Sequence, residues 1–252
     1  MKKHFLISLL LTLTLVLTCC SNEPQPAPGP EPVPPKGWDN SQAYMFYWDG
    51  NTLKLREEYQ TQSAFGTLII PDTVDSKTVD KVSVVADLGR AESIMVPPTI
   101  VDLFVEFGLI QTINIPKSVT SLLIDSTLSS ISIEEGSAYS LDGNNVYKDG
   151  GTLLVKVLSG ALGEYVFSPS VTKVADYAFR GCNSITKLTI PITVEMEIGR
   201  HTFYTCGSLQ EVYIENAITT IGEEAFYGCR DLEIVTIPDT VTSIGEGAFR
   251  YC

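Results

Sequence analysis

The stretch IGEEAFYGCRDLEIVTIPDTVTSIGEGAFRYC, residues 221–252, decides the fold because it contains one motif twice. IGEEAFYGC and IGEGAFRYC begin 23 residues apart, at Ile221 and Ile244. Two earlier copies, VADYAFRGC and IGRHTFYTC, begin at Val174 and Ile198. A motif that returns at a nearly constant spacing predicts a repeat architecture. The repeated aromatic and thiol positions are Phe179, Phe203, Phe226 and Phe249, and Cys182, Cys206, Cys229 and Cys252.

A second pattern, apolar-x-x-apolar-x-apolar, lies between these motifs. It is present in ITKLTI (185–190), LQEVYI (209–214) and LEIVTI (232–237). A period of about 20 to 29 residues with this pattern is typical of leucine-rich repeats, in which each unit forms one short strand and a returning turn. We therefore predict a leucine-rich repeat solenoid. Short parallel strands are expected on its concave face, and short helical or extended turns on its convex face.

Weaker copies of the strand pattern extend the array upstream to residue 65. Their apolar positions are Phe65-Leu68-Ile70, Ala91-Ile94-Val96, Ile110-Ile113-Ile115 and Leu128-Ile131-Ile133. The steps from Ile94 to Ile113 and from Ile113 to Ile131 are 19 and 18 residues, and these units lack the Ala-Phe turn. We expect them to return across the convex side in extended form. Residues 65–252 are therefore predicted to fold as one continuous solenoid, because each unit is covered only by its neighbours.

Two segments fall outside the period. Residues 134–163 are predicted to contain an inserted β-hairpin, since apolar strands flank the turn residues at 149–151. Residues 38–64 include AYMFYWDGNTLKL, where Asp49-Gly50 separates an aromatic alternation from two leucines. Because a solenoid needs an end cover, we interpret this second hairpin as an N-terminal cap. An exposed aromatic binding patch is the alternative.

The N-terminus has the features of a bacterial lipoprotein. Residues 1–19 have a basic start and an apolar run that is too short for a membrane span, so we predict a signal peptide. The run ends in a lipobox-like LTCC, and either Cys19 or Cys20 is the predicted lipidation site, with Leu17 favouring Cys20. An ordinary signal peptide is the alternative. Residues 20–37 hold seven prolines and are predicted to form an extended tether.

The repeat unit I-P-x-x-V-T-x-I-G-x-x-A-F-x-x-C-x-x-L, seen with departures in residues 190–209 and 214–232, resembles the BspA-like leucine-rich repeat proteins of the Bacteroides group. The inserted SLDGNNVYKDGGTLLVKV and the lipoprotein start with its proline-rich tether are similar to surface lipoproteins of the same group. Departures include Glu215, where proline is expected, and Thr202 in place of alanine. The resemblance implies a leucine-rich repeat fold, surface display and binding of host or bacterial proteins. It implies no catalytic residues.

Composition and motifs argue against several functional classes. The chain has 30 acidic and 17 basic residues and a formal net charge of −13, which disfavours nucleic acid as a partner. Of its two histidines, His4 lies in the signal segment and His201 is expected at an exposed, variable turn position. We find no nucleophile–base pair, phosphate loop or metal-ligand spacing, so we predict neither an enzyme nor a cofactor or metal site. The repeat cysteines, which metal binding or disulfides could also explain, are interpreted as small buried hydrophobes.

The outward-facing positions of the predicted concave strands supply the candidate ligand-binding residues. They are mostly small and hydroxyl-bearing, and the candidate anchors are Lys187, Glu211, Tyr213 and Ile234. A carbohydrate site would need several aromatic platforms, and Tyr213 is the single aromatic residue in these columns. We predict a lipid-anchored protein of the cell envelope, exposed at the outer membrane, that binds host matrix or bacterial surface proteins and meets the membrane only through its lipid. The alternatives are a glycan-capturing accessory lipoprotein of a nutrient-uptake system and a structural spacer.

Overall fold

The computed structural model describes residues 41–60, 65–194, 196–215 and 217–252. The chain divides into two units, Met1–Glu31 and Pro32–Cys252, and all described residues belong to the second. The predicted signal peptide, the tether and both candidate lipidation cysteines lie outside the described residues. In the described part of the chain, no helix is long and apolar enough to cross a membrane.

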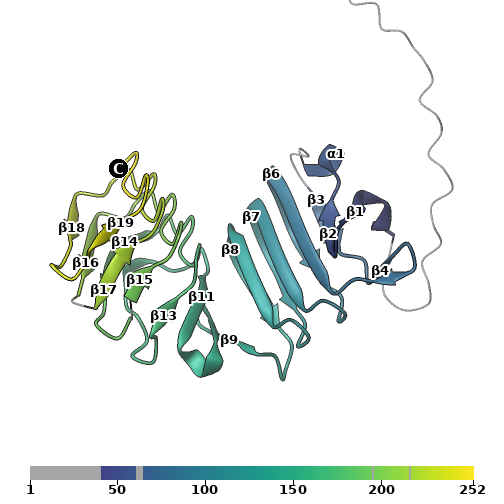
Figure 1. The fold of residues 1–252 in the computed structure, drawn as a ribbon, viewed down its shortest axis with the longest axis horizontal. Coiled ribbons are helices and arrows are strands. Elements are labelled where there is room, and N and C mark those ends of the chain that lie inside the picture. Colours follow the sequence, from purple (N-terminus) through teal and green to yellow (C-terminus); the bar gives the residue numbers. More distant parts are fainter. Residues whose placement is uncertain (1–40, 61–64, 195, 216) are drawn as a thin grey trace, which may run out of the picture. The chain divides into compact units, whose positions relative to one another are not determined.

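The C-terminal repeats form two parallel sheets that run along the array (Figure 1). One sheet has the order β12 (Gly163–Tyr165), β14 (Ile185–Ile190), β16 (Glu211–Ile214) and β18 (Ile234–Thr236). The other contains β15 (Met196–Ile198), β17 (Ile218–Ile221) and β19 (Ser243–Ile244). Consecutive strands of each sheet come from consecutive repeats, so each turn contributes one strand to each face. The segments that carry the Ala-Phe motif are turns and contain no helix.

The repeated phenylalanines form a continuous stack in the core of these turns. Ring centroids are 4.8 Å apart between Phe179 and Phe203, 4.9 Å between Phe203 and Phe226, and 5.2 Å between Phe226 and Phe249. The first three rings are fully buried. Because the rings contact one another from turn to turn, the predicted 23-residue register is confirmed.

The repeated cysteines lie beside this stack. Cys182, Cys206 and Cys229 are buried, as expected for small core residues, whereas Cys252 is exposed. Each thiol also has a polar partner in the preceding turn. Cys206 Sγ donates to the carbonyl of Phe179 at 3.0 Å, and Cys229 Sγ donates to that of Phe203 at 3.2 Å. The carbonyls of Phe179 and Phe203 also accept the amides of Cys182 and Cys206, so each thiol adds a second hydrogen bond to its acceptor and links two successive turns.

The glycine of the Ile-Gly pair lets neighbouring turns approach closely. A Cβ atom added at Gly222 would lie 2.8 Å from the carbonyl carbon of Gly199, and one added at Gly245 would lie 2.4 Å from the amide nitrogen of Glu223. These obstacles are backbone atoms, which cannot rotate away as a side chain can. Close packing between turns therefore requires glycine at positions 222 and 245, whereas the first copy of the motif has Ala175 at the equivalent position.

Gly222→Ala is expected to lower the free energy of unfolding by about 1–3 kcal/mol, since the two turns must separate to admit the methyl group. Gly66→Ala is the matched control, because a Cβ at Gly66 would meet no atom within 4 Å. Urea unfolding followed by circular dichroism measures both variants. Equal midpoints for Gly222→Ala and the wild-type chain would contradict the close approach.

The upstream turns contain strands much longer than the predicted short ones. They are β6 (Lys81–Met95), β7 (Asp102–Ile115) and β8 (Ser121–Ile133), and the five-residue β3 (Phe65–Ile69) pairs in parallel with β6. The pairing of Ala91 with Ile110, and of Ile110 with Leu128, places the weaker sequence copies in the predicted register. Their extended return is also confirmed. Without an Ala-Phe turn, the strands of the two faces join into one, interrupted only by register shifts such as that between Ala86 and Arg90.

An antiparallel hairpin precedes the long strands. After a short 3₁₀ turn η1 (Ala43–Met45), strands β1 (Phe46–Asp49) and β2 (Thr52–Leu55) pair. β2 also pairs in parallel with β6, with Leu53 opposite Val82. Phe46, Leu53 and Leu55 are buried. This burial favours packing of the hairpin on the array over an exposed aromatic patch, and its role as a cap stays a prediction. The one-turn helix α1 (Glu57–Gln60) and the small hairpin of β4 (Thr73–Val74) and β5 (Lys77–Thr78) complete this region.

The segment between the two sets of turns forms a further antiparallel sheet. Strands β9 (Tyr139–Asp142), β10 (Asn145–Lys148) and β11 (Leu153–Val157) pair in this order, with the 3₁₀ turn η2 (Asp149–Gly151) between the last two. β11 also pairs in parallel with β13 (Lys173–Val174). Side chains of this segment belong to both hydrophobic clusters of the protein, one around the long strands and one around the phenylalanine stack.

Candidate ligand-binding site

The sheet of β12, β14, β16 and β18 presents the candidate residues on its outward face. Side chains alternate along a strand, so Leu188 and Val212 point into the core while their sequence neighbours point outward. Lys187 pairs with Glu211, and Glu211 pairs with Ile234 on the next strand. Tyr213 lies two residues beyond Glu211 on the same face. The parallel register therefore brings together all four predicted anchors.

Three of these side chains contact one another. The Lys187 ammonium lies 3.5 Å from Oε2 of Glu211, and the Tyr213 hydroxyl donates to the same oxygen at 3.0 Å. The Lys187 ammonium also lies 5.4 Å from the centre of the Tyr213 ring. The hydrogen bond to Glu211 raises the pKa of Tyr213, which keeps the phenol protonated. These mutual contacts hold the three side chains in one arrangement before any ligand binds.

Ile234 extends this cluster with apolar surface. Its side chain is 44% exposed on β18, directly beside Glu211 in the strand register. An exposed isoleucine beside a tyrosine and an ion pair offers a ligand one apolar side chain and several polar ones. We call Lys187, Glu211, Tyr213 and Ile234 the concave patch. It has the composition of a protein-binding surface, which concentrates affinity in aromatic and charged anchors next to apolar area.

Nothing in the concave patch provides a reactive group. Glu211 is engaged by the Lys187 ammonium and the Tyr213 hydroxyl, and no histidine, cysteine, serine or threonine among the described residues is hydrogen-bonded to its carboxylate. Across the residues that the structure describes, no group of three or more His, Cys, Asp or Glu side chains could hold a metal ion.

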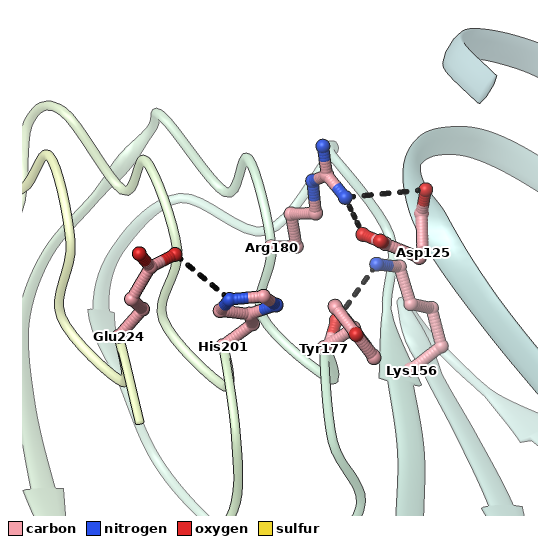
Figure 2. Close-up of polar contacts among 6 residues, drawn as sticks. All are labelled: Asp125, Lys156, Tyr177, Arg180, His201 and Glu224. Atoms are coloured by element: carbon pink, nitrogen blue, oxygen red, sulfur yellow. Dashed lines mark hydrogen bonds and ion pairs between the residues drawn. The ribbon is translucent and has the colours of Figure 1, made fainter. Parts of the chain in front are cut away.

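The structure also shows a row of polar contacts on the turn side of the repeats that sequence analysis missed (Figure 2). The Arg180 guanidinium forms an ion pair with the largely buried carboxylate of Asp125 on β8, 55 residues earlier in the chain. The same guanidinium lies 5.0 Å from the centre of the Tyr204 ring. Arg180 thus links a long-strand turn to the later repeats. No local spacing pairs these residues, so a sequence motif could not have indicated the contact.

His201 is not the exposed turn residue that the sequence predicts. Its side chain is only 14% exposed, and its Nε2 atom lies 2.9 Å from Oε2 of Glu224 in the next repeat (Figure 2). The imidazole ring packs between Tyr177 and Tyr204, with centroids 5.0 and 4.9 Å away. Burial lowers the pKa of His201, and the hydrogen bond to Glu224 opposes this shift. The prediction was wrong because residues that vary between repeats still contact their equivalents when the turns stack.

Lys156 on β11 is a fully buried cation. Its Nζ atom donates to the carbonyl of Tyr177 at 2.9 Å (Figure 2), and its surroundings are otherwise those of the core. Burial lowers its pKa from 10.5 to about 8, and the nearby Cys182 thiol opposes this shift weakly. Because no carboxylate among the described residues forms an ion pair with it, burying the Lys156 cation costs the fold free energy.

Comparisons with known proteins agree with this architecture. Residues 159–252 match the family model of the BspA type leucine rich repeat region, in six copies. Among solved structures, the chain is similar to the pneumococcal vaccine antigen PcpA, with 19% identity and a TM-score of 0.53 over 79% of this chain and 74% of that one.

A leucine-rich cell surface protein from Faecalibacterium prausnitzii is also similar, with 21% identity and a TM-score of 0.52. The match covers 68% of this chain and 55% of that protein, so the chain spans about half of its length. A comparison with curated proteins gives no match. The predicted leucine-rich repeat solenoid is confirmed by the family match and by the likeness of the two structures.

Proposed function

Since residues 159–252 are leucine-rich repeats of the BspA type, we propose that the chain is a bacterial surface protein whose concave patch binds other proteins. The observation that carries this proposal is the preformed contact of Lys187, Glu211 and Tyr213 beside the exposed Ile234. A surface whose polar side chains already hold one another loses little conformational freedom when a partner binds. The expected partners are host matrix proteins or surface proteins of other bacteria.

The concave patch favours a protein ligand over a glycan. Tyr213 is the single aromatic side chain in the outward columns of this sheet, and its hydroxyl is already bonded to Glu211. The neighbouring Ile234 offers apolar area, which a protein partner can cover and a sugar covers poorly. A glycan-capturing accessory protein and a spacer without a ligand remain the alternatives that the binding experiment tests.

Tyr213→Ala combined with Ile234→Ser is expected to abolish binding to whichever purified matrix protein the chain captures in a panel of immobilised proteins. Loss of two central anchors removes most of the affinity of a typical interface. The measurement is surface plasmon resonance, with melting curves to show that the variant is folded.

Arg200→Ala combined with Glu223→Ala is the control for this experiment. These two residues form an exposed ion pair on the turn side, at 3.7 Å, away from the strands of the concave patch. Binding should be unchanged in the control. If the control variant loses binding while the Tyr213 and Ile234 variant keeps it, the concave patch is not the recognition surface. Capture of glycans alone would favour the accessory-protein alternative, and no capture would favour a spacer.

The same proposal places the protein in the cell envelope, at the outer membrane, through a lipid on Cys20 or Cys19. The basis is the apolar run that ends at this cysteine pair and the proline-rich segment that follows it. Stable anchoring requires two or more acyl chains, which a bacterial lipoprotein N-terminus carries. The proline-rich tether would then hold the repeats away from the lipid surface.

Replacing both Cys19 and Cys20 by alanine is expected to release the protein from the membrane fraction, because the acyl chains can no longer attach. Cys252→Ala is the matched control, since Cys252 is an exposed cysteine of the repeats. Cell fractionation and intact mass spectrometry measure the outcome. A double variant that stays in the membrane fraction with the mass of an otherwise unmodified chain contradicts lipid anchoring.

A further inference from the structure

We propose that a hollow on the turn side of the repeats, separate from the concave patch, binds a carboxylate-bearing sugar unit of an acidic glycan. The hollow is formed by the loops that carry the repeated cysteines. Backbone hydrogen bonds stack these loops in register, from Thr205 N to Tyr227 O at 2.7 Å and from Gly228 N to Arg250 O at 2.8 Å. Equivalent residues of successive repeats therefore stand in columns along the array.

Two glycines open the hollow within these columns. The residues that follow the cysteines form the column Asn183, Gly207 and Arg230, so Gly207 leaves a gap between two long side chains. In the neighbouring column, Gly228 leaves a gap between Thr205 and Tyr251. The space that results is about 500 Å³, within the range of about 300–1,000 Å³ typical of small-ligand sites.

The groups around the hollow are polar or aromatic. Thr205 lines it with a side chain whose methyl carbon lies nearest the gap at Gly228, and Tyr227 and Tyr251 contribute aromatic rings. The side-chain oxygen of Asn183 accepts a hydrogen bond from the backbone N–H of Gly207 at 2.8 Å. This bond orients the Asn183 side chain and leaves its NH₂ group as a donor for a ligand. No aliphatic side chain lines the hollow, and the lining loops present no strand edge. Hydrogen-bonding groups beside aromatic rings suit the hydroxyl groups and ring faces of a sugar better than an apolar peptide side chain.

The charge of the hollow selects an acidic ligand. Within the described ranges, neither Arg230 nor Arg250 forms an ion pair, although the whole chain has 30 acidic residues. Arg230 lines the hollow, and the Arg250 guanidinium lies 4.9 Å from the centre of the Tyr251 ring at its far wall. A guanidinium that lacks a carboxylate partner can form two parallel hydrogen bonds to the carboxylate of a ligand. Uronic acids and sialic acids both carry this group.

The test measures binding of defined sugars to the full chain by isothermal titration calorimetry. Trigalacturonic acid is the uronic acid probe and sialyllactose is the sialic acid probe. The fully methyl-esterified trigalacturonate and lactose are their neutral counterparts. At least one acidic probe is expected to bind about tenfold or more tightly than its neutral counterpart, because only the acidic form pairs with the guanidinium. The probe that binds shows whether the hollow accepts a uronic acid or a sialic acid.

Two variants locate the site. Arg230→Gln removes the cation and Gly207→Leu fills the gap, and each is expected to weaken binding of the acidic probe about tenfold or more. Gly207 has an ordinary backbone conformation, and circular dichroism checks that its variant is folded. If it is not, Arg230→Gln alone decides the test. Arg200→Gln, at an exposed arginine outside the hollow, is the control and should bind normally.

The proposal is overturned if neither acidic probe binds more tightly than its neutral counterpart, or if Arg230→Gln binds as well as the wild-type chain. Equal affinity for a polyglutamate peptide would also overturn it, since the hollow would then be a general anion site and not a sugar site. The Tyr213 and Ile234 variant should keep sugar binding, so this result is independent of the function proposed for the concave patch.

Discussion

Phe226→Ala is expected to lower the free energy of unfolding by about 3–5 kcal/mol, as a large-to-small change in a closed core does. Phe226 is fully buried and stacks on Phe203 on one side and Phe249 on the other. Its removal leaves a cavity between two turns whose spacing is fixed by strand pairing, so the surroundings cannot collapse to fill it. Both neighbouring rings also lose a stacking partner.

Urea or thermal unfolding of Phe226→Ala and of Glu246→Ala measures this effect. Glu246 is exposed in the following turn, and its replacement should change stability by less than about 0.5 kcal/mol. A repeat array can lose individual turns before the rest unfolds, so amide exchange should also show the loss of protection concentrated near Phe226. Similar unfolding of the two variants would contradict the central place of the phenylalanine stack.

Lys156→Met is expected to stabilise the protein by about 1–3 kcal/mol at pH 7. The fall of the Lys156 pKa from 10.5 to about 8 corresponds to a cost of about 3 kcal/mol for burying the cation, at about 1.4 kcal/mol per pKa unit. The variant also loses the hydrogen bond to the Tyr177 carbonyl, which reduces the expected stabilisation by about 1 kcal/mol. Methionine has a similar shape and carries no charge.

The pH dependence identifies the cause. Because the folded-state pKa lies below the unfolded value, the unfolded chain binds more protons between pH 8 and 10.5, and the stability of the wild-type protein should rise with pH in that window. The advantage of Lys156→Met should therefore shrink from pH 7 to pH 9. Burial raises the pKa of the Cys182 thiol to about 11, so above pH 9 this group makes the stability of the protein fall with pH. An advantage that does not change between pH 7 and 9 would show that Lys156 is not desolvated in the folded state.

The parts of the fold that repeat could be predicted from the sequence. The spacing of Phe179, Phe203 and Phe226 gives the turn length, and the strand pattern gives the outward columns, since equivalent positions in a solenoid stack on one another. This reasoning placed Lys187, Glu211 and Ile234 on neighbouring strands, as the structure has them. Their hydrogen-bond geometry was not predictable, because it depends on rotamers that no spacing encodes.

The parts that do not repeat were beyond such reasoning. Glu215 is a departure from the expected proline, and the structure explains it: its carboxylate accepts the backbone amide of Ile192 in the preceding turn at 2.7 Å. Glu134 does the same for Lys117 at 3.0 Å, at the corresponding place in an upstream turn. At this position the repeat therefore has either a proline ring or a glutamate that forms a hydrogen bond between turns. A single deviation in one repeat does not indicate its partner in another.

The stacked phenylalanines and the close approach at the Ile-Gly pair also bear on how genes for such proteins change. From Ile198 onward, each turn of the C-terminal array offers the next turn the same ring, thiol and glycine backbone. Unequal recombination that adds or removes one whole copy would therefore join surfaces that already fit, and would lengthen or shorten the array by about one strand spacing of 4.8 Å. The 18- and 19-residue long-strand turns lack this motif, so an exchange between the two kinds of turn would join surfaces that do not match. Variation in length is therefore expected to occur within the C-terminal array, in steps of one repeat.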